Sequence, residues 1–217
     1  MMQYTLVIGN KAYSSWSLRA WLAMRQVDIP FVEVRIALYQ DDHLSKIERY
    51  SRAGKVPILV AGDITVWDSL AICEFLAERH PERRLWPVDD EARAHARAIS
   101  AEMHAGFAAL RSNLGMNVRR TYPGVGMTSE VKHDIARIDA MWDDCLRRYG
   151  GPFLCGDFSI ADAMYAPVAT RFKTYGVALS AGASGYAERL LELPAMTEWY
   201  AAARAESEVL PQFELQI

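Results

Sequence analysis

Cysteine and histidine, the residues that cross-link small folds and bind transition metals, are scarce in this sequence. Its 217 residues include five histidines and three cysteines, Cys73, Cys145 and Cys155. The odd number of cysteines and the lack of a C-x-x-C spacing argue against a disulfide framework, a zinc site and a dithiol redox centre. No H-x-x-x-H pair stands beside a carboxylate, so we expect no metal.

Long apolar runs and a surplus of one charge are missing as well. No segment approaches the roughly 20 apolar residues of a membrane-spanning helix. The start MMQYTLVIGN has neither the basic residues nor the apolar core of a signal peptide, so we expect a cytoplasmic protein with no membrane partner. With 24 basic and 27 acidic residues the formal net charge is −3, which does not indicate a nucleic-acid partner.

The first part of the chain alternates between strand and helix patterns. Residues 4–8 and 30–38 are typical of strands, and residues 56–68 predict a hairpin with its turn at 61–63. Helical spacing begins at Ser17 and again at Ser69. With a short helix or loop after the second strand, the order β-α-β-(α)-β-β-α predicts a small mixed sheet covered by helices.

Strand patterns stop in the second part of the chain. Apolar residues recur every three or four positions from Ala92 to Leu114, which predicts one long helix. A second helix is predicted over residues 131–149, a third behind a capping box formed by Ser159 and Asp162, and a last one from Pro194. The chain is therefore predicted to hold two domains: an α/β domain, 1–81; a linker, 82–90; and an all-α domain, 91–217.

Four motifs, in this order along the chain, give the sequence a family resemblance. They are SSWSLR, GKVPIL, WDSLAICEFL and FSIADAMYAP, and together they resemble the cytosolic glutathione transferases. The first is closest to the zeta-class pattern S-S-C-S-x-R, with Trp16 in the place of cysteine. The resemblance implies a thioredoxin-like domain followed by a helical bundle, glutathione as co-substrate without a metal, a small electrophile as acceptor, and a homodimer.

The first motif is the predicted thiol end of the glutathione site. By register with the family pattern, Ser14 donates a hydrogen bond to the glutathione thiolate, and Ser15 is the runner-up. From the residues alone, these serines indicate only the start of a helix, and we assign that capping role to Ser17. Trp16 either lines the acceptor pocket or packs internally.

The second and third motifs are predicted to hold the rest of the tripeptide. Most X-Pro bonds are trans, but the resemblance implies a cis bond at Val56–Pro57, with the Val56 backbone pairing with the cysteinyl part of glutathione. Lys55 either meets the glycyl carboxylate or is an ordinary surface lysine. Asp68 and Ser69, at a helix start, are expected to bind the γ-glutamyl end.

The acceptor pocket is expected between the two domains. Met103, Phe107 and Arg111 lie along the predicted long helix, and Arg171 matches an arginine that zeta-like enzymes use for an anionic substrate. Two arginines aimed at one cleft favour an acceptor that carries a carboxylate. Two other functions stay open beside glutathione transfer: a zeta-like cis–trans isomerase of an unsaturated diacid, and a non-catalytic binding module.

Overall fold

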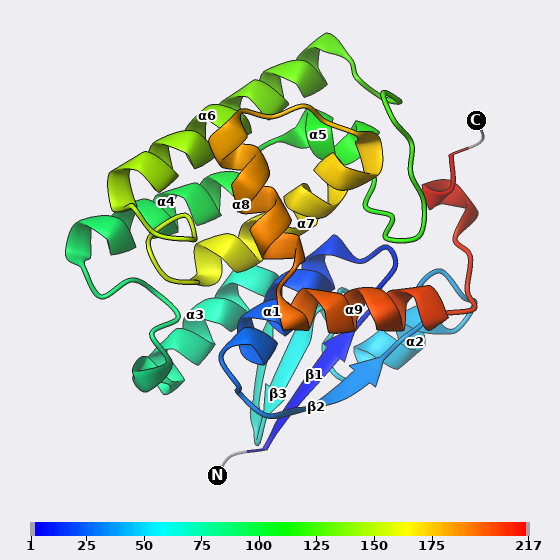
Figure 1. Cartoon of the computed structure of the whole chain (residues 1–217). Helices are drawn as coiled ribbons and strands as arrows, with labels where there is room; N and C mark the ends of the chain where they lie inside the picture. The colour runs from blue at the N-terminus through cyan, green and yellow to red at the C-terminus, as the bar shows by residue number, and fades with distance from the viewer. Residues whose placement is uncertain (1–2, 216–217) are drawn as a thin grey trace.

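The computed structural model describes residues 3–215 and places a small sheet below a group of helices (Figure 1). The sheet has the strand order β2-β1-β3-β4. Its strands are β1 (Tyr4–Ile8), β2 (Phe31–Arg35), β3 (Ile58–Ala61) and β4 (Ile64–Trp67). β1 runs parallel to β2 and antiparallel to β3, while β3 and β4 form the predicted hairpin.

Three helices accompany these strands, and the predicted order of elements is confirmed. They are α1 (Ser15–Gln26), α2 (His43–Glu48) and α3 (Ser69–Arg79). The element order and the mixed sheet are those of a thioredoxin-like domain, as the resemblance implied. The domain boundaries at residues 81 and 91 stay a prediction.

The second part of the described chain is helical. It contains two short 3-10 turns, η1 (Pro81–Arg83) and η2 (Pro211–Phe213), and the helices α4 (Asp90–Ala105), α5 (Ala108–Asn113), α6 (Ser129–Tyr149), α7 (Ile160–Tyr175), α8 (Ala181–Leu191) and α9 (Pro194–Ala205). Among the helices of residues 3–215, none combines the length and the apolar character of a membrane span.

The prediction of one long helix from Ala92 to Leu114 is wrong, because the helix breaks at Gly106. The Gly106 N–H still donates to the Glu102 carbonyl at 2.7 Å, but Phe107 then takes a left-handed conformation with φ 55°. A new helix starts with its Leu110 N–H donating to the Asp134 carboxylate at 2.9 Å. The apolar spacing continues across the break, so periodicity alone could not reveal it.

Helix α8 was not predicted, and its composition explains why. Its sequence AGASGYAERLL is dominated by alanine, glycine and serine over the first two turns, so the apolar stripe is faint. The buried face consists of Ala183, Tyr186, Ala187 and Leu190. Small residues let this helix approach the bundle closely, and Tyr186 anchors it by donating to Asp162 at 3.0 Å.

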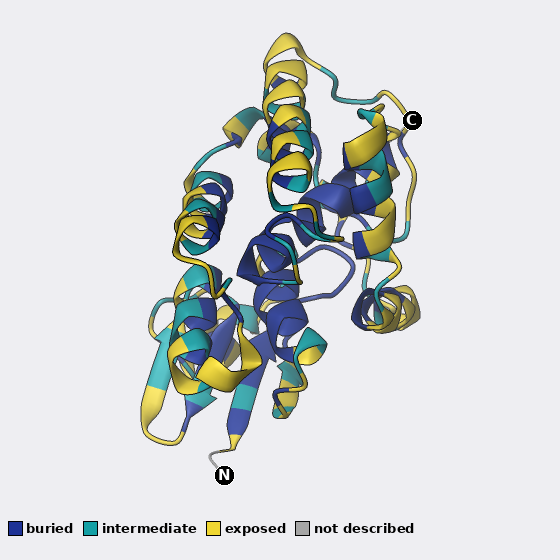
Figure 2. Cartoon of the chain, turned by 60° about the vertical axis from the view of Figure 1, so that its left-hand side comes forward, coloured by how far each residue is buried: buried dark blue, intermediate teal, exposed yellow. Residues whose placement is uncertain are grey.

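Helices α1 and α7 form the buried centre of the molecule (Figure 2). Every residue of α7 is buried except Lys173, and α1 has eight consecutive buried residues, Ser17–Met24. A helix that is buried on all sides must be covered by several partners. Helix α1 packs against α3, α7 and α9, so it belongs to the contact surface of both predicted domains.

The capping box at the start of α7 is confirmed and lies in the core. The Asp162 carboxylate accepts from the Ser159 N–H at 2.8 Å, the Leu154 N–H at 3.1 Å and the Tyr186 hydroxyl at 3.0 Å. Burial raises the pKa of Asp162 to about 6. The linker also docks here, because the Ile160 N–H donates to the Leu85 carbonyl at 2.9 Å.

Replacing Asp162 by alanine should lower the free energy of unfolding by about 3 kcal/mol, since it leaves several buried donors without an acceptor. Ser159→Ala removes the cap bond from the Ala161 N–H and one hydroxyl bond to Asp162, and it should cost about 1 kcal/mol. Urea unfolding followed by circular dichroism measures both. Equal losses for the two variants would contradict the central role of the carboxylate.

Candidate functional site

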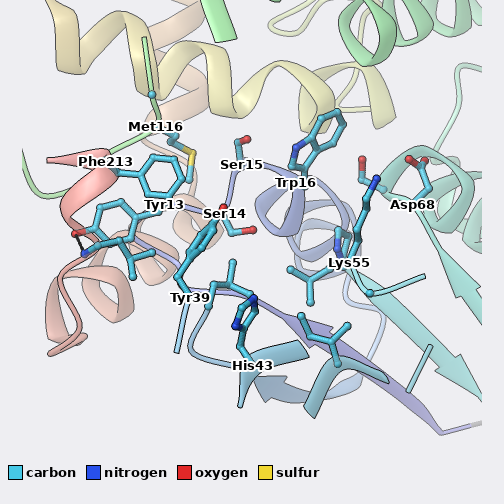
Figure 3. A pocket seen from close by; sticks show the side chains of 18 of the residues that line it. Tyr13, Ser14, Ser15, Trp16, Tyr39, His43, Lys55, Asp68, Met116 and Phe213 are labelled. Atoms are coloured by element: carbon cyan, nitrogen blue, oxygen red, sulfur yellow. Dashed lines mark hydrogen bonds between the residues drawn. The ribbon is translucent and has the colours of Figure 1, made fainter. Parts of the chain in front are cut away.

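A cavity of about 800 Å³ opens where the β1–α1 loop meets the helical part of the chain. Figure 3 shows the side chains on its wall. Ser14 and Ser15 lie in the middle. Trp16, Lys55 and Asp68 lie on one side of them, and the aromatic side chains of Tyr13, Tyr39 and Phe213 lie on the other. The cavity thus has a polar end, an aromatic end and two hydroxyl groups between them.

Most of the predicted site residues line this cavity together. They are Ser14, Ser15, Trp16, Lys55, Val56, Pro57, Asp68, Ser69, Arg111 and Arg171. They come from five separate segments of the sequence: the β1–α1 loop with the first residues of α1, the residues just before β3, the start of α3, the middle of α5 and the second half of α7.

The expectation that Met103 and Phe107 line the pocket is wrong. Met103 is fully buried and Phe107 is 8% exposed, and both belong to the main hydrophobic core instead of the cavity wall. Met103 lies on the buried face of α4, and for Phe107 the physical reason is the break at Gly106. It turns Phe107 inward, while Arg111, one turn further along α5, reaches the cavity.

Ser14 caps α1, so the assignment of that role to Ser17 is also wrong. The Ser14 hydroxyl accepts from the Ser17 N–H at 3.3 Å, and the two hydroxyl oxygens lie 2.7 Å apart. Ser17 is fully buried one turn inside the helix and accepts from the Gly9 N–H at 3.0 Å. Ser14 therefore lies both on the cavity wall and at the N-terminus of α1, where the helix dipole is positive.

Ser15 and Trp16 are in contact with arginines. The Arg171 guanidinium donates to the Ser15 hydroxyl at 3.3 Å, to the Leu114 carbonyl at 2.7 Å and to the Pro167 carbonyl at 3.1 Å. The Trp16 ring lies 5.4 Å from the Arg111 guanidinium carbon. Burial lowers the pKa of Arg171 to about 10, so this side chain is a cation held in a poorly solvated place.

The polar end of the cavity contains a hydroxyl without a partner. Asp68 caps α3 through its Oδ1, which accepts from the Leu70 and Ala71 N–H groups at 2.9 and 3.2 Å. Its Oδ2 lies 3.1 Å from Nε2 of His104. Ser69 is 1% exposed, and its Oγ has no partner among the described residues. A free hydroxyl at a helix start suits an anionic ligand group.

The Val56–Pro57 bond is cis, as the resemblance implied. It lies directly before β3, between the two serines of the first motif and the start of α3. Lys55 is exposed at the cavity rim.

The aromatic end of the cavity was not predicted. Phe213 stacks on Tyr13 with ring centroids 5.5 Å apart and meets Tyr39 at 5.8 Å. Met116 completes this wall (Figure 3). Nothing in the local sequence marks Phe213, because it lies 200 residues after Tyr13 and reaches the cavity only through the C-terminal segment.

That segment, which we call the C-terminal strap (residues 206–215), also holds the serine loop. The Glu206 carboxylate accepts from the Lys11 N–H at 2.6 Å and from the Ala12 N–H at 3.0 Å. Arg119 fixes the strap by donating to the Glu206 and Glu208 carbonyls at 2.8 and 2.6 Å. The loop that presents Ser14 is therefore tied to the last part of the described chain.

The cysteines lie elsewhere. None of the three lines the cavity within residues 3–215. Burial raises the pKa of Cys73 to about 12, so that thiol stays protonated at neutral pH. Thiol chemistry in this cavity would have to use a thiol that the ligand brings.

Comparison with known proteins agrees with this geometry. Residues 13–79 match a family model described as "Glutathione S-transferase, N-terminal domain", and residues 90–202 match "Glutathione S-transferase, C-terminal domain". A probable maleylacetoacetate isomerase from Caenorhabditis elegans is 30% identical over 76% of this chain and 77% of its own length. Glutathione S-transferase 1 from Dianthus caryophyllus is 28% identical over 77% and 75%.

A solved structure of a glutathione transferase homologue from Burkholderia, with bound glutathione, has the same fold. It superposes with a TM-score of 0.73 at 22% identity, covering 94% of this chain and 100% of the other.

Glu206→Gln should lower both the free energy of unfolding, by about 2 kcal/mol, and the turnover of the site. The amide keeps one acceptor oxygen for one of the two backbone N–H groups and turns its own NH₂ donor toward the other. Glu208→Gln is the matched control, because Glu208 pairs with Arg35 and accepts no bond from the serine loop. It should cost under about 1 kcal/mol. Urea unfolding and steady-state kinetics measure both effects. If the two variants have the same stability and the same turnover, Glu206 does not hold the serine loop.

Proposed function

Because this chain belongs to the glutathione S-transferase family, we propose that it binds glutathione in this cavity, holds its thiol as a thiolate at Ser14 and transfers it to a small electrophile. One observation carries the proposal. Ser14, the cis Val56–Pro57 turn and the unpaired Ser69 hydroxyl lie on the wall of one cavity. A tripeptide can be held there at its thiol, its backbone and its γ-glutamyl carboxylate.

The energy required of the thiol end is modest. A free thiol has a pKa of about 8.5, so lowering it by about two pH units takes roughly 2.7 kcal/mol of preference for the anion. A charge-assisted hydrogen bond supplies about 1.5–3 kcal/mol, and the helix N-terminus adds up to about 1 kcal/mol. Both contributions converge at Ser14, because it caps α1 and lines the cavity.

Ser14 can cap the helix and donate to a thiolate at the same time. Heavy-atom positions leave the hydroxyl proton between Ser14 and Ser17 free to lie on either oxygen. If Ser17 donates to Ser14, then the Ser14 oxygen accepts two bonds and its own proton points to the ligand. Ser15 is the runner-up, since its oxygen accepts from Arg171 and its proton is free.

The other contacts follow from the same placement. The Ser69 hydroxyl and the start of α3 bind the γ-glutamyl carboxylate, and Asp68 faces the α-ammonium group. The Val56 backbone pairs with the cysteinyl unit, and Lys55 meets the glycyl carboxylate. We further propose the homodimer and the cytoplasmic location that are typical of the family.

A second activity, isomerisation of an unsaturated diacid, is favoured by a separate observation. Arg111 and Arg171 both reach the cavity, and two cations suit an acceptor with carboxylates. One relative is named a probable maleylacetoacetate isomerase. Trp16 weighs against this activity, because a bulky ring stands where the zeta pattern has a small thiol.

The experiment that tests the function begins with retention on immobilised glutathione and a thermal shift at millimolar glutathione. Turnover is then measured with electrophiles, peroxides, mixed disulfides and a cis-diacid, each with glutathione. If the protein is not retained and its Tm does not shift, the transferase proposal fails and the non-catalytic module is the function that remains. Turnover of the diacid alone would replace transfer by isomerisation.

Ser14→Ala should lower kcat by about 10- to 100-fold with little change in glutathione affinity, because the lost bond forms mainly with the thiolate. Ser14→Asn is the matched control for capping. Asparagine caps helices well but has no hydroxyl, so this variant should keep the Tm of the parent and stay slow. Steady-state kinetics and calorimetric titration give the two parameters. If Ser15→Ala alone abolishes turnover, the assignment to Ser14 is wrong.

Ser69→Ala should weaken glutathione binding about tenfold without destabilising the protein. The Ser69 hydroxyl has no protein partner to lose, whereas a bond to a ligand carboxylate is worth about 1.5 kcal/mol or more. Calorimetric titration and thermal unfolding separate the two effects. A fall in Tm with unchanged affinity would assign Ser69 to the fold and not to the ligand.

A further inference from the structure

Arg19 is a buried cation without a hydrogen-bond partner in the described residues. It lies on α1, one turn after Ser15, and is 1% exposed. Its Nε and Nη1 atoms bond to nothing among residues 3–215. Burial, together with the nearby charges of Arg171 and Arg111, lowers the pKa of Arg19 to about 9. Such a group destabilises the fold unless something offsets its cost.

One carboxylate of the described residues, Asp68, offsets part of this cost, because its negative charge raises the pKa of Arg19 without forming an ion pair with it. The charged and titratable groups that interact with Arg19 are Arg171 and Tyr165 on α7, Arg111 on α5, Cys73 on α3 and Asp68 at the N-cap of α3. Asp68 is already engaged by two N–H groups and by His104 on α4. Burial keeps Cys73 protonated. Arg19, Arg111 and Arg171 form no ion pair with a carboxylate among residues 3–215.

The aromatic ring of Trp16 takes the place of a counter-ion. The Arg19 guanidinium carbon lies 4.3 Å from the ring centroid, and that of Arg111 lies 5.4 Å from it. A cation–π contact stabilises a guanidinium, but it does not cancel the charge as a carboxylate would. Trp16, which contacts the Arg19 guanidinium with one face, also lines the cavity.

We propose that Arg19, held behind Trp16, stabilises the glutathione thiolate through a positive charge that no ion pair among the described residues neutralises, so that Trp16 and Arg19 act as one unit. The inference rests on the proposed function and assigns a second source of thiol activation beside Ser14. The thiol gives its proton to solvent water, and the remaining thiolate attacks the electrophile. Arg19 is a positioning residue and not a catalytic one, because Trp16 keeps it off the cavity wall.

This assignment accounts for the structure better than a purely structural role. A buried guanidinium used for packing would be expected to bond with its Nε and Nη atoms, as Arg171 does with two carbonyls. In a low-dielectric place, a unit charge several ångströms away still acts on a thiolate. Burial destabilises both the Arg19 guanidinium and the glutathione thiolate. Their mutual attraction compensates for this cost only when glutathione is bound.

The test replaces Arg19 by methionine, which has a similar length and no charge. The pKa of bound glutathione is read from the ultraviolet absorbance of its thiolate across a pH series. We expect Arg19→Met to raise that pKa by about 1 and to lower kcat/KM about tenfold at a pH below it. Because it also removes an unpaired buried charge, the Tm should rise by about 3 °C. A structural arginine would give the opposite change in Tm.

Two further variants serve as controls. Arg19→Lys keeps a positive charge and should retain most of the thiol activation. Arg25→Met removes a cation two turns from the start of the same helix, where Arg25 is exposed and paired with Glu198, and it should leave the thiol pKa and kcat/KM unchanged.

Each remaining outcome counts against the proposal. If the parent does not bind glutathione, the proposed function fails and the inference fails with it. If glutathione binds and Arg19→Met leaves the thiol pKa unchanged, only the role of Arg19 is overturned. If Arg19→Met and Arg19→Lys raise the thiol pKa equally, the shape of the side chain and not its charge controls the thiol. A failure of Arg19→Met to fold would show that the guanidinium is structural.

Discussion

The burial of α1 on all sides is the constraint on which the rest of this molecule depends. The helix lies against the sheet domain and against α7 and α9 of the helical part, and Ser17–Met24 are buried without interruption. Any polar residue in that stretch must find a partner or carry an energetic cost. The constraint also places the start of α1 at the meeting point of both predicted domains, where the cavity opens.

Two residues that cap helices also lie on the wall of the cavity. Ser14 and Asp68 each cap a helix, and each lines the cavity next to a second polar residue. Asp68 does so at φ 78°, a conformation that costs energy for a side chain other than glycine. The fold thus places the positive ends of two helices at one cavity, with Glu206, near the end of the chain, holding the loop that precedes α1.

The sequence predicts the local features of this structure well and the long-range ones poorly. The element order of the first predicted domain, the capping box at Ser159 and the glutathione transferase family were predicted and confirmed, because each leaves a mark in local sequence patterns. The cis Val56–Pro57 bond was expected from the family resemblance alone, since most X-Pro bonds are trans. The roles of Ser14, Lys55 and Ser69 toward glutathione stay predictions. The break at Gly106 left no mark in the apolar spacing, and Phe213 and Glu206 reach the site only through tertiary folding.

The departure from the zeta pattern at Trp16 is best understood together with Arg19. A small thiol at position 16 would leave the buried guanidinium open to water, which would screen its charge. The indole ring covers Arg19, stabilises it from one face and still carries no opposing charge. Replacing cysteine by tryptophan therefore narrows the acceptor space while preserving a positive field behind it. On the proposed function, this arrangement favours a small acceptor that reacts only with a fully ionised glutathione thiolate. It disfavours a reaction that uses a protein cysteine at position 16 as a second thiol.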